Sequence, residues 1–142
     1  MPDIHIGSDH AGYALKAVLA RELAALGYTV IDHGTHSEES CDYPLVARDL
    51  CGAIAQDKAP GILVCGTGIG MSIAANRFDH VRAALCMNEL QARMARRHND
   101  ANVLCLGARV IGIELALAIM VAFLESSFEG GRHQRRLDEI KA

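Results

Sequence analysis

Short runs of apolar, mostly β-branched residues alternate along this chain with longer segments in which apolar residues recur every three or four positions. The short runs predict buried strands, and the longer periodic segments predict amphipathic helices. Strands are expected at residues 4–7, 29–32, 62–65, 81–86 and 103–106. Helices are expected at residues 13–26, 44–56, 71–77, 89–97 and 112–126.

A strand followed by a helix, repeated along the whole chain, is typical of a parallel sheet covered by helices on both faces and joined by right-handed crossovers. We therefore predict an α/β protein with a single domain over residues 1–142, a three-layer α/β/α sandwich around a five-stranded, Rossmann-like parallel sheet. The last residues, GGRHQRRLDEIKA, predict a break and then a short polar helix. This C-terminal helical tail is not needed to complete the sheet.

Composition agrees with one compact domain and narrows the possible partners. A length of 142 residues with 51% hydrophobic content is sufficient for one sizeable core. The net charge of −3 gives no electrostatic footprint for nucleic acid or an anionic membrane, so neither is an expected partner. The chain has no apolar run near the ~20 residues of a membrane span, and its N-terminus does not look like a signal peptide. We therefore expect a cytoplasmic protein with reduced cysteines.

The stretch GILVCGTGIGMS, at residues 61–72, carries the clearest candidate chemistry. An apolar strand ends at Cys65, glycines follow at alternate positions, and a helix start comes next. Such a turn exposes backbone N–H groups that suit an anion or an oxyanion, and the same field favours thiolate over thiol. We interpret the loop as an anion cradle beside a nucleophile or base. The alternative is a tight connection with a buried, inert cysteine.

The glycine spacing does not fit the common nucleotide-binding motifs. Gly66, Gly68 and Gly70 give G-x-G-x-G after the third strand, whereas a dinucleotide fingerprint is G-x-G-x-x-G, usually after the first. A Walker loop needs a lysine, and none follows Gly70. Cys86 and Cys105 also end predicted strands, but without a glycine cradle after them we expect both in the core.

Further polar residues flank the predicted strands, and ligands of such folds gather at strand ends. Asp9 and His10 follow the first strand, where they suit hydroxyl recognition or proton transfer. The alternative is that Asp9 caps the first helix and His10 is an ordinary loop residue. His98 and Asn99 lie between the fourth helix and the fifth strand, where the alternative for His98 is a helix-terminal residue that favours the local dipole.

Two further groups have candidate ligand-binding side chains. In the tail, Arg132 and Arg136 stand four residues apart, so a helix places both guanidinium groups on one face, suited to a phosphate. Arg135 points elsewhere, and the alternative is a solvated surface helix. His33, His36 and Cys41 are close in sequence, but their spacing is not a recognised zinc pattern, so we expect no metal.

Five segments occur in the order and spacing of one enzyme family: DHAGY from Asp9, DYP from Asp42, CGTGIGMSIAANR from Cys65, RRHNDANVLCLGAR from Arg96, and EGGRHQRR from Glu129. Over essentially its whole length the chain resembles the RpiB/LacAB family of sugar-phosphate isomerases, in particular the ribose-5-phosphate isomerase B proteins. The resemblance implies an aldose–ketose isomerase of the pentose phosphate pathway. It would interconvert ribose 5-phosphate and ribulose 5-phosphate through a cis-enediolate, with no cofactor and no metal.

The resemblance also implies roles for individual residues. Cys65 would be the base that moves a proton between C2 and C1, Thr67 and the loop N–H groups would hold the enediolate, and His98 would help to open the furanose ring. Substrate binding is implied for Asp9, His10, Tyr43, Gly66, Thr67, Gly68, Ile69, Gly70, Asn99, Arg109, Arg132 and Arg136. Some relatives use a glutamate as base, but Ala74 and Ala75 offer no carboxylate here.

The implied partners are a phosphorylated sugar and further copies of the chain. In the family resembled, Cys65 and His98 would come from different subunits of a homo-oligomer, a dimer or tetramer, and the apolar segment 111–123 is long enough for both core and interface. One alternative is an isomerase of a six-carbon sugar phosphate, such as allose 6-phosphate or galactose 6-phosphate. Others are a non-catalytic phosphate-ligand binding module and a metal-dependent isomerase or hydrolase.

Overall fold

The computed structural model describes residues 1–140, and strands and helices alternate along them. Each predicted strand and helix is confirmed, with boundaries that differ by one or two residues. The elements are β1 (Asp3–Ser8), α1 (Tyr13–Ala25), β2 (Thr29–Asp32), α2 (Tyr43–Asp57), β3 (Gly61–Cys65), α3 (Ile69–Ala75), β4 (Ala83–Leu85), α4 (Glu89–Asn99), β5 (Val103–Gly107), α5 (Ile113–Glu125) and α6 (Arg132–Glu139).

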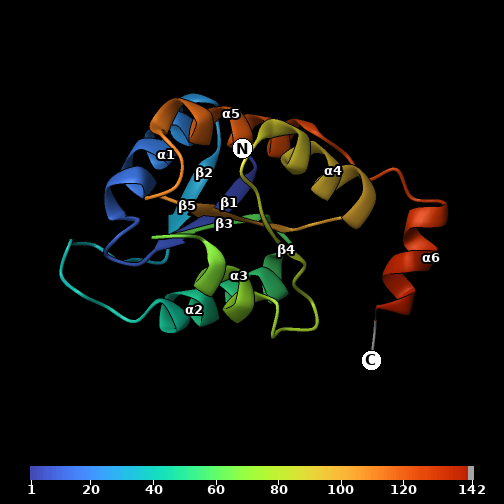
Figure 1. The fold of residues 1–142 in the computed structure, drawn as a ribbon, viewed down its shortest axis with the longest axis horizontal. Coiled ribbons are helices and arrows are strands. Elements are labelled where there is room, and N and C mark those ends of the chain that lie inside the picture. Colours follow the sequence, from blue (N-terminus) through green and yellow to red (C-terminus); the bar gives the residue numbers. More distant parts are fainter. Residues whose placement is uncertain (141–142) are drawn as a thin grey trace.

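The strands form one parallel sheet in the order β2-β1-β3-β5-β4. Helices α1, α4 and α5 cover one face and helices α2 and α3 cover the other (Figure 1). This arrangement confirms the predicted three-layer sandwich.

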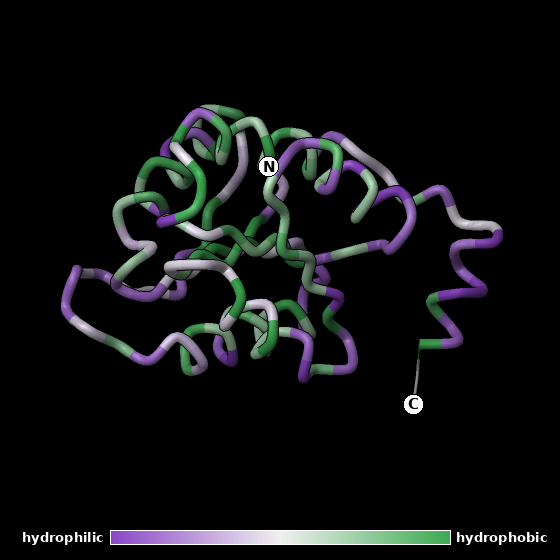
Figure 2. Tube along the Cα trace, in the orientation of Figure 1, coloured by the Kyte–Doolittle hydropathy of each residue, from purple (hydrophilic) through white to green (hydrophobic). Residues whose placement is uncertain are grey.

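Alternation along the central strands divides the core between the two faces. Ile62 and Val64 of β3 pack with residues of α1, α4 and α5, while Leu63 and Cys65 pack with residues of α2 and α3. Successive side chains of a strand point to opposite faces, so a strand covered on both sides is apolar throughout. Figure 2 shows apolar segments running through the sheet and the inner helices, and polar residues dominating the outer loops.

The two C-terminal helices differ in how they meet this core. Helix α5 is the apolar segment singled out in the sequence, and its Ala116, Ile119 and Phe123 are buried in the core. Helix α6 lies outside the three layers, next to the end of α4 (Figure 1). The predicted polar tail is therefore confirmed as a separate helix. None of the helices within residues 1–140 has the length and apolarity needed to span a bilayer.

The chain reverses direction across the sheet between its first and third strands. From β1 it continues to the neighbouring edge strand β2, and from β3 it continues toward the other edge. The carboxyl ends of β1 and β3 are adjacent, since the Asp9 N–H donates to the Val64 carbonyl at 3.1 Å. Such a point of reversal leaves a crevice where ligands of α/β proteins bind.

Candidate active site

The loop between β3 and α3 turns back on the thiol at the end of the strand. Gly68 has a φ of 80°, and a Cβ added there would lie 2.5 Å from a methyl carbon of Leu85, so both conformation and space require glycine. This turn aims the Gly68 N–H at the Cys65 sulfur, which accepts it at 3.1 Å. The predicted contact between a cysteine and the backbone donors of the glycine loop is therefore present.

Cys65 differs from the other core cysteines in its surroundings. Burial raises the pKa of both Cys51 and Cys86 to about 11. Burial likewise holds the pKa of Cys105 well above its ordinary value, and the neighbouring thiols add to the effect. These three groups remain protonated and unreactive at neutral pH. Cys65 is also only 5% exposed, but its sulfur accepts a backbone N–H, the kind of contact that stabilises a thiolate.

Two side chains from other parts of the chain lie against the glycine loop because its glycines leave room for them. The Arg109 N–H donates to the Gly66 carbonyl at 2.9 Å, and a Cβ on Gly66 would lie 3.3 Å from the Arg109 guanidinium. A Cβ on Gly70 would lie 2.7 Å from the Tyr43 ring. Thr67 follows Gly66 in the same loop. The structure thus places Tyr43 and Arg109 beside the loop that contains Cys65 and Thr67.

Asp9 and His10 lie beside this loop, at the end of β1. One carboxylate oxygen of Asp9 accepts the Gly12 N–H at 3.1 Å, so Asp9 holds the turn that leads into α1. His10 Nδ1 accepts the Cys41 N–H at 3.2 Å. This contact assigns the neutral ring proton to Nε2, which is free to donate to a ligand.

His98 and Asn99 lie at the opposite end of the strands, where the strands begin. Helix α4 runs back against the strands, so its last residues precede the start of β5, whereas Cys65 is paired with Gly107 at the end of β5. The five residues of β5 separate these two ends by about 16 Å at the usual rise per residue. Within one chain, the structure does not bring His98 to Cys65.

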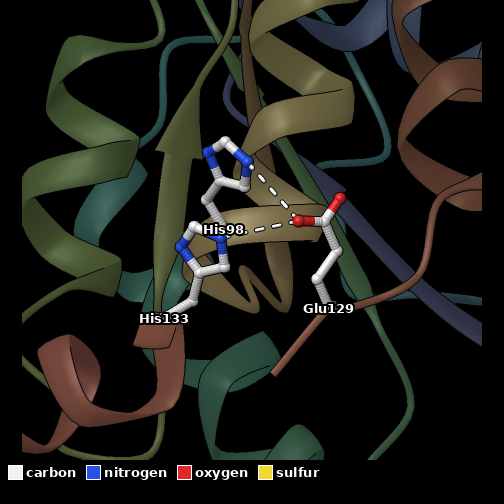
Figure 3. A group of neighbouring side chains, drawn as sticks. All are labelled: His98, Glu129 and His133. Atoms are coloured by element: carbon white, nitrogen blue, oxygen red, sulfur yellow. Dashed lines mark ion pairs between the residues drawn. The ribbon is translucent and has the colours of Figure 1, made fainter. Parts of the chain in front are cut away.

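Three side chains cluster at the end of α4, as Figure 3 shows. His98 Nε2 lies 3.7 Å from a carboxylate oxygen of Glu129, and His133 Nε2 lies 3.5 Å from the same oxygen. The two imidazole rings are stacked with centroids 4.2 Å apart and an interplanar angle of 11°. The sequence analysis missed Glu129 and His133. Their spacing of four residues within EGGRHQRR could have paired them with each other, but it does not indicate that they meet His98.

Helix α6 carries the predicted arginine pair. Arg132 and Arg136 both lie within the helix, one turn apart, as predicted. Arg135 forms an ion pair with Glu139, with 3.8 Å between Nε and Oε1, and its side chain is 70% exposed. The helix begins directly next to the cluster of His98, Glu129 and His133, so both arginines are located at the same end of the strands as His98.

The three residues weighed as a metal site do not form one. His33 Nε2 lies 2.7 Å from His5 Nδ1, and its Nδ1 lies 2.9 Å from an Asp49 oxygen. Within residues 1–140, His33, His36 and Cys41 are not among the side chains close enough together to share an ion. The cluster of His98, Glu129 and His133 is close enough, and its geometry is considered below.

A cavity of about 640 Å³ opens at the starts of the strands, lined by Arg82, Arg96 and Asn102 among others. It lies away from Cys65, at the opposite end of the strands. Although this cavity is large, its arginines are already bonded, since Arg82 Nε donates to the Asp100 carbonyl at 2.7 Å and Arg96 Nη1 to Asp100 Oδ1 at 3.1 Å. The loop chemistry therefore identifies the candidate active site better than cavity size does.

The fold and the Cys65 loop together define a parallel α/β sandwich protein with a thiol and a glycine-rich loop at its topological switch point. The chain belongs to the Ribose/Galactose Isomerase family, which it matches over residues 4–140. The resemblance drawn from its sequence motifs is thereby confirmed.

Two curated relatives cover nearly the whole chain. Ribose-5-phosphate isomerase B of Escherichia coli strain K12 is 47% identical, over 100% of this chain and 96% of the relative. D-erythrulose-4-phosphate isomerase of Pectobacterium atrosepticum is 44% identical, over 99% of this chain and 93% of the relative.

Two solved structures share the fold. Ribose-5-phosphate isomerase B of Clostridium thermocellum superposes with a TM-score of 0.95 at 50% identity, covering 97% of this chain and 94% of that chain. The Mycoplasma genitalium protein of the same name, solved with bound ribulose-5-phosphate, gives a TM-score of 0.93 at 40% identity, covering 97% and 93%.

Proposed function

We propose that this protein is an aldose–ketose isomerase that interconverts ribose 5-phosphate and ribulose 5-phosphate. The observation that carries the proposal is the Cys65 sulfur at 3.1 Å from the Gly68 N–H, inside a loop of backbone donors. An aldose–ketose isomerase needs one base that serves two carbons and donors for the oxyanion that develops beside them. Membership of the Ribose/Galactose Isomerase family and the names of the relatives support the assignment.

In the proposed reaction, Cys65 acts as a thiolate base on the open-chain sugar. It takes the proton from C2, and the electron pair forms the C1–C2 double bond of a cis-enediolate with its charge on O1. The thiol then returns the proton to C1, the hydroxyl proton of O2 passes to O1, and the carbonyl is left at C2. Because no electron leaves the substrate, and the thiolate and the loop donors supply the base and the oxyanion contacts, we propose no cofactor and no metal.

The remaining side chains have binding roles in this proposal. Thr67 and the N–H groups of Gly66, Gly68, Ile69 and Gly70 hold the enediolate oxygens. Substrate hydroxyls are bound by Asp9, His10, Tyr43 and Asn99, and the phosphate chiefly by Arg109, Arg132 and Arg136. His98 donates a proton to the ring oxygen when the furanose opens, a task suited to a group that titrates near neutral pH.

The placement of these groups supports a site shared between chains. Cys65 lies at the end of its strand, whereas the opposite end of the strands holds a second set of residues: His98, Asn99, Arg132 and Arg136. A second copy of the chain must therefore supply one of the two sets. Apolar side chains are exposed next to the Cys65 loop, at Leu45 (57%), Ile69 (52%) and Ile73 (61%). A second copy would remove them from water, and we infer a homo-oligomer, a dimer or tetramer, on this basis.

We assign the whole chain, residues 1–142, to one isomerase domain that acts in the cytoplasm on a step of the pentose phosphate pathway. A second candidate substrate is a four-carbon sugar phosphate, because one relative with 44% identity is named for erythrulose 4-phosphate. A six-carbon substrate is the third candidate, because the family description includes galactose.

A substrate panel tests these assignments. The panel contains four-, five- and six-carbon aldose phosphates with their unphosphorylated counterparts, and each turnover is measured with and without EDTA. The highest kcat/KM is expected for ribose 5-phosphate, unchanged by EDTA. A higher value for another phosphate would replace the substrate, and loss of activity in EDTA would identify a metal-dependent enzyme. Binding of sugar phosphates without any turnover would identify a binding module.

A further inference from the structure

Backbone contacts fix the relative positions of Glu129, His133 and His98. The Glu129 N–H donates to the carbonyl of Arg97, the residue before His98, at 3.0 Å. Gly130 and Gly131 then adopt positive φ angles of 70° and 58°, which glycine adopts without strain, and the chain turns into α6. The His133 N–H donates back to the Gly130 carbonyl at 3.1 Å. The turn after α5 therefore brings both side chains to the end of α4.

The exposures of the three side chains suggest what the cluster does. The His133 side chain is 8% exposed, the most buried of the three, although it belongs to a helix outside the sandwich. The His98 side chain is 40% exposed, so one side of its ring remains available to a ligand. Because Nε2 of His98 faces Glu129, Nδ1 is the nitrogen left for that ligand.

The ring geometry does not suit a metal ion. A metal lies about 2.0–2.1 Å from a histidine nitrogen and in the plane of each ring that binds it. The rings of His98 and His133 are nearly parallel, 11° apart, and stacked at 4.2 Å. Two such planes do not meet at one ion between the rings, so the shared carboxylate, and not a cation, is the group that both imidazoles face.

Charge distinguishes the two histidines. Burial lowers the pKa of His133, as do the positive charges of His98, Arg132 and Arg136, while the Glu129 carboxylate acts in the opposite direction. Burial and the nearby positive charges therefore both disfavour a proton on His133. The Glu129 carboxylate and the carbonyl end of α4 both place negative charge beside His98.

We propose that Glu129 and His133 are positioning residues for His98: the carboxylate selects the ring orientation with Nε2 inward and Nδ1 outward, and the stacked imidazole holds that ring in place. The inference rests on the proposed role of His98 in ring opening. It also gives His133 a second effect, since the residue attaches α6, with Arg132 and Arg136, to the end of α4.

The test compares variants in steady-state kinetics with ribose 5-phosphate and in NMR spectra of the imidazole nitrogens. Glu129→Gln keeps the size of the side chain and removes its charge. Glu139→Gln is the matched control, because it removes the same charge from an exposed ion pair. Glu139 pairs with Arg135, and its side chain is 69% exposed. We expect Glu129→Gln to lower kcat about tenfold, a part of what a general acid contributes, with KM within about twofold. The ring signals of His98 should shift in this variant and not in the control.

A second pair of variants separates stacking from stability. His133→Phe keeps an aromatic ring against His98, whereas His133→Ala removes it, so His133→Phe should retain the higher kcat. His98→Ala is measured alongside. If His98→Ala loses kcat while Glu129→Gln keeps wild-type kcat and unchanged His98 signals, the positioning inference is overturned and the role of His98 stands. If His98→Ala keeps wild-type kcat, the role of His98 is wrong, and the inference fails with it.

Discussion

Cys65 and His98 of one chain lie at opposite ends of the strands of one parallel sheet. Cys65 ends β3 at the level of Gly107, whereas His98 precedes the start of β5. A proton donor and a base that act on one pentose must both touch it, and the length of a strand separates these two. The proposed reaction therefore requires two copies of the chain.

Mixing two inactive variants tests this requirement. Cys65→Ala and His98→Ala proteins are unfolded or dissociated together and reassembled. In a random mixture of dimers, half are mixed, and one of the two sites in each mixed dimer has both wild-type residues. About a quarter of wild-type activity should return. Subunit exchange is followed by native mass spectrometry, and confirmed exchange without recovered activity would exclude a shared site.

The thiol of Cys65 is expected to be the reactive cysteine of the core. Cys65→Ala should lower kcat by about 10²–10⁴, the usual contribution of a general base, while thermal unfolding changes little. Cys86→Ala is the control, because burial raises the pKa of that thiol to about 11 and its removal should leave kcat unchanged. Iodoacetamide labelling with peptide mass spectrometry should show that ribose 5-phosphate protects Cys65. Equal labelling with and without the sugar would contradict the assignment.

The arginines of α6 give a separate prediction about the phosphate. Arg132→Ala or Arg136→Ala should raise KM for ribose 5-phosphate about tenfold or more, because each removes a charged donor to a dianion. KM for free ribose should change little. Arg135→Ala is the matched control on the same helix, since Arg135 pairs with Glu139. Equal increases in KM for both sugars would rule out phosphate binding by this pair.

The sequence predicted the layers of the fold well, because hydrophobic periodicity directly reports which faces are buried. It also predicted that Cys65 and the loop glycines lie together, since local spacing fixes a strand-to-helix turn. It grouped Asp9 and His98 as residues near strand ends. The structure separates them, because a helix that returns antiparallel to the strands places its last residues at the starts of the strands, away from Asp9.

Contacts between distant segments were not predictable from the sequence. Glu129 and His133 meet His98 only because the turn after α5 bonds to the last turn of α4, and periodicity contains no information about that docking. His33 was weighed as a metal ligand from its neighbours in sequence. In the structure its partner is His5, 28 residues away, on β1.

His5 and His33 belong to a chain of hydrogen bonds that joins β1, the end of β2 and α2. His5 Nε2 lies 2.7 Å from a carboxylate oxygen of Asp57, and His5 Nδ1 lies 2.7 Å from His33 Nε2. His33 Nδ1 lies 2.9 Å from a carboxylate oxygen of Asp49. Carboxylates only accept, so both outer nitrogens must carry protons, and the bond between the rings needs a third. The assignment from these distances gives the pair one positive charge between two carboxylates.

This network predicts a loss of stability in acid. Desolvation raises the pKa of Asp57, but the Ala59 N–H and the His5 imidazole outweigh it, and the pKa is lowered. A lowered carboxyl pKa stabilises the fold above the unfolded value of about 3.9, and this stability is lost as the pH falls through the folded value. Asp57→Asn should therefore lower the free energy of unfolding by about 1 kcal/mol at pH 7 and by less at pH 3.

Urea unfolding at pH 7, 5 and 3 measures the difference between wild type and Asp57→Asn. Asp138→Asn is the control, because Asp138 accepts an exposed bond from Gln134, at 2.9 Å, and the variant should change stability little at any of these pH values. The Asp57 carboxylate is charged and its partner His5 is buried, which makes this bond stronger than a neutral one, so the two variants should separate most at pH 7. If Asp57→Asn matches Asp138→Asn at pH 7, or if its deficit grows as the pH falls to 3, Asp57 does not stabilise the network through its charge.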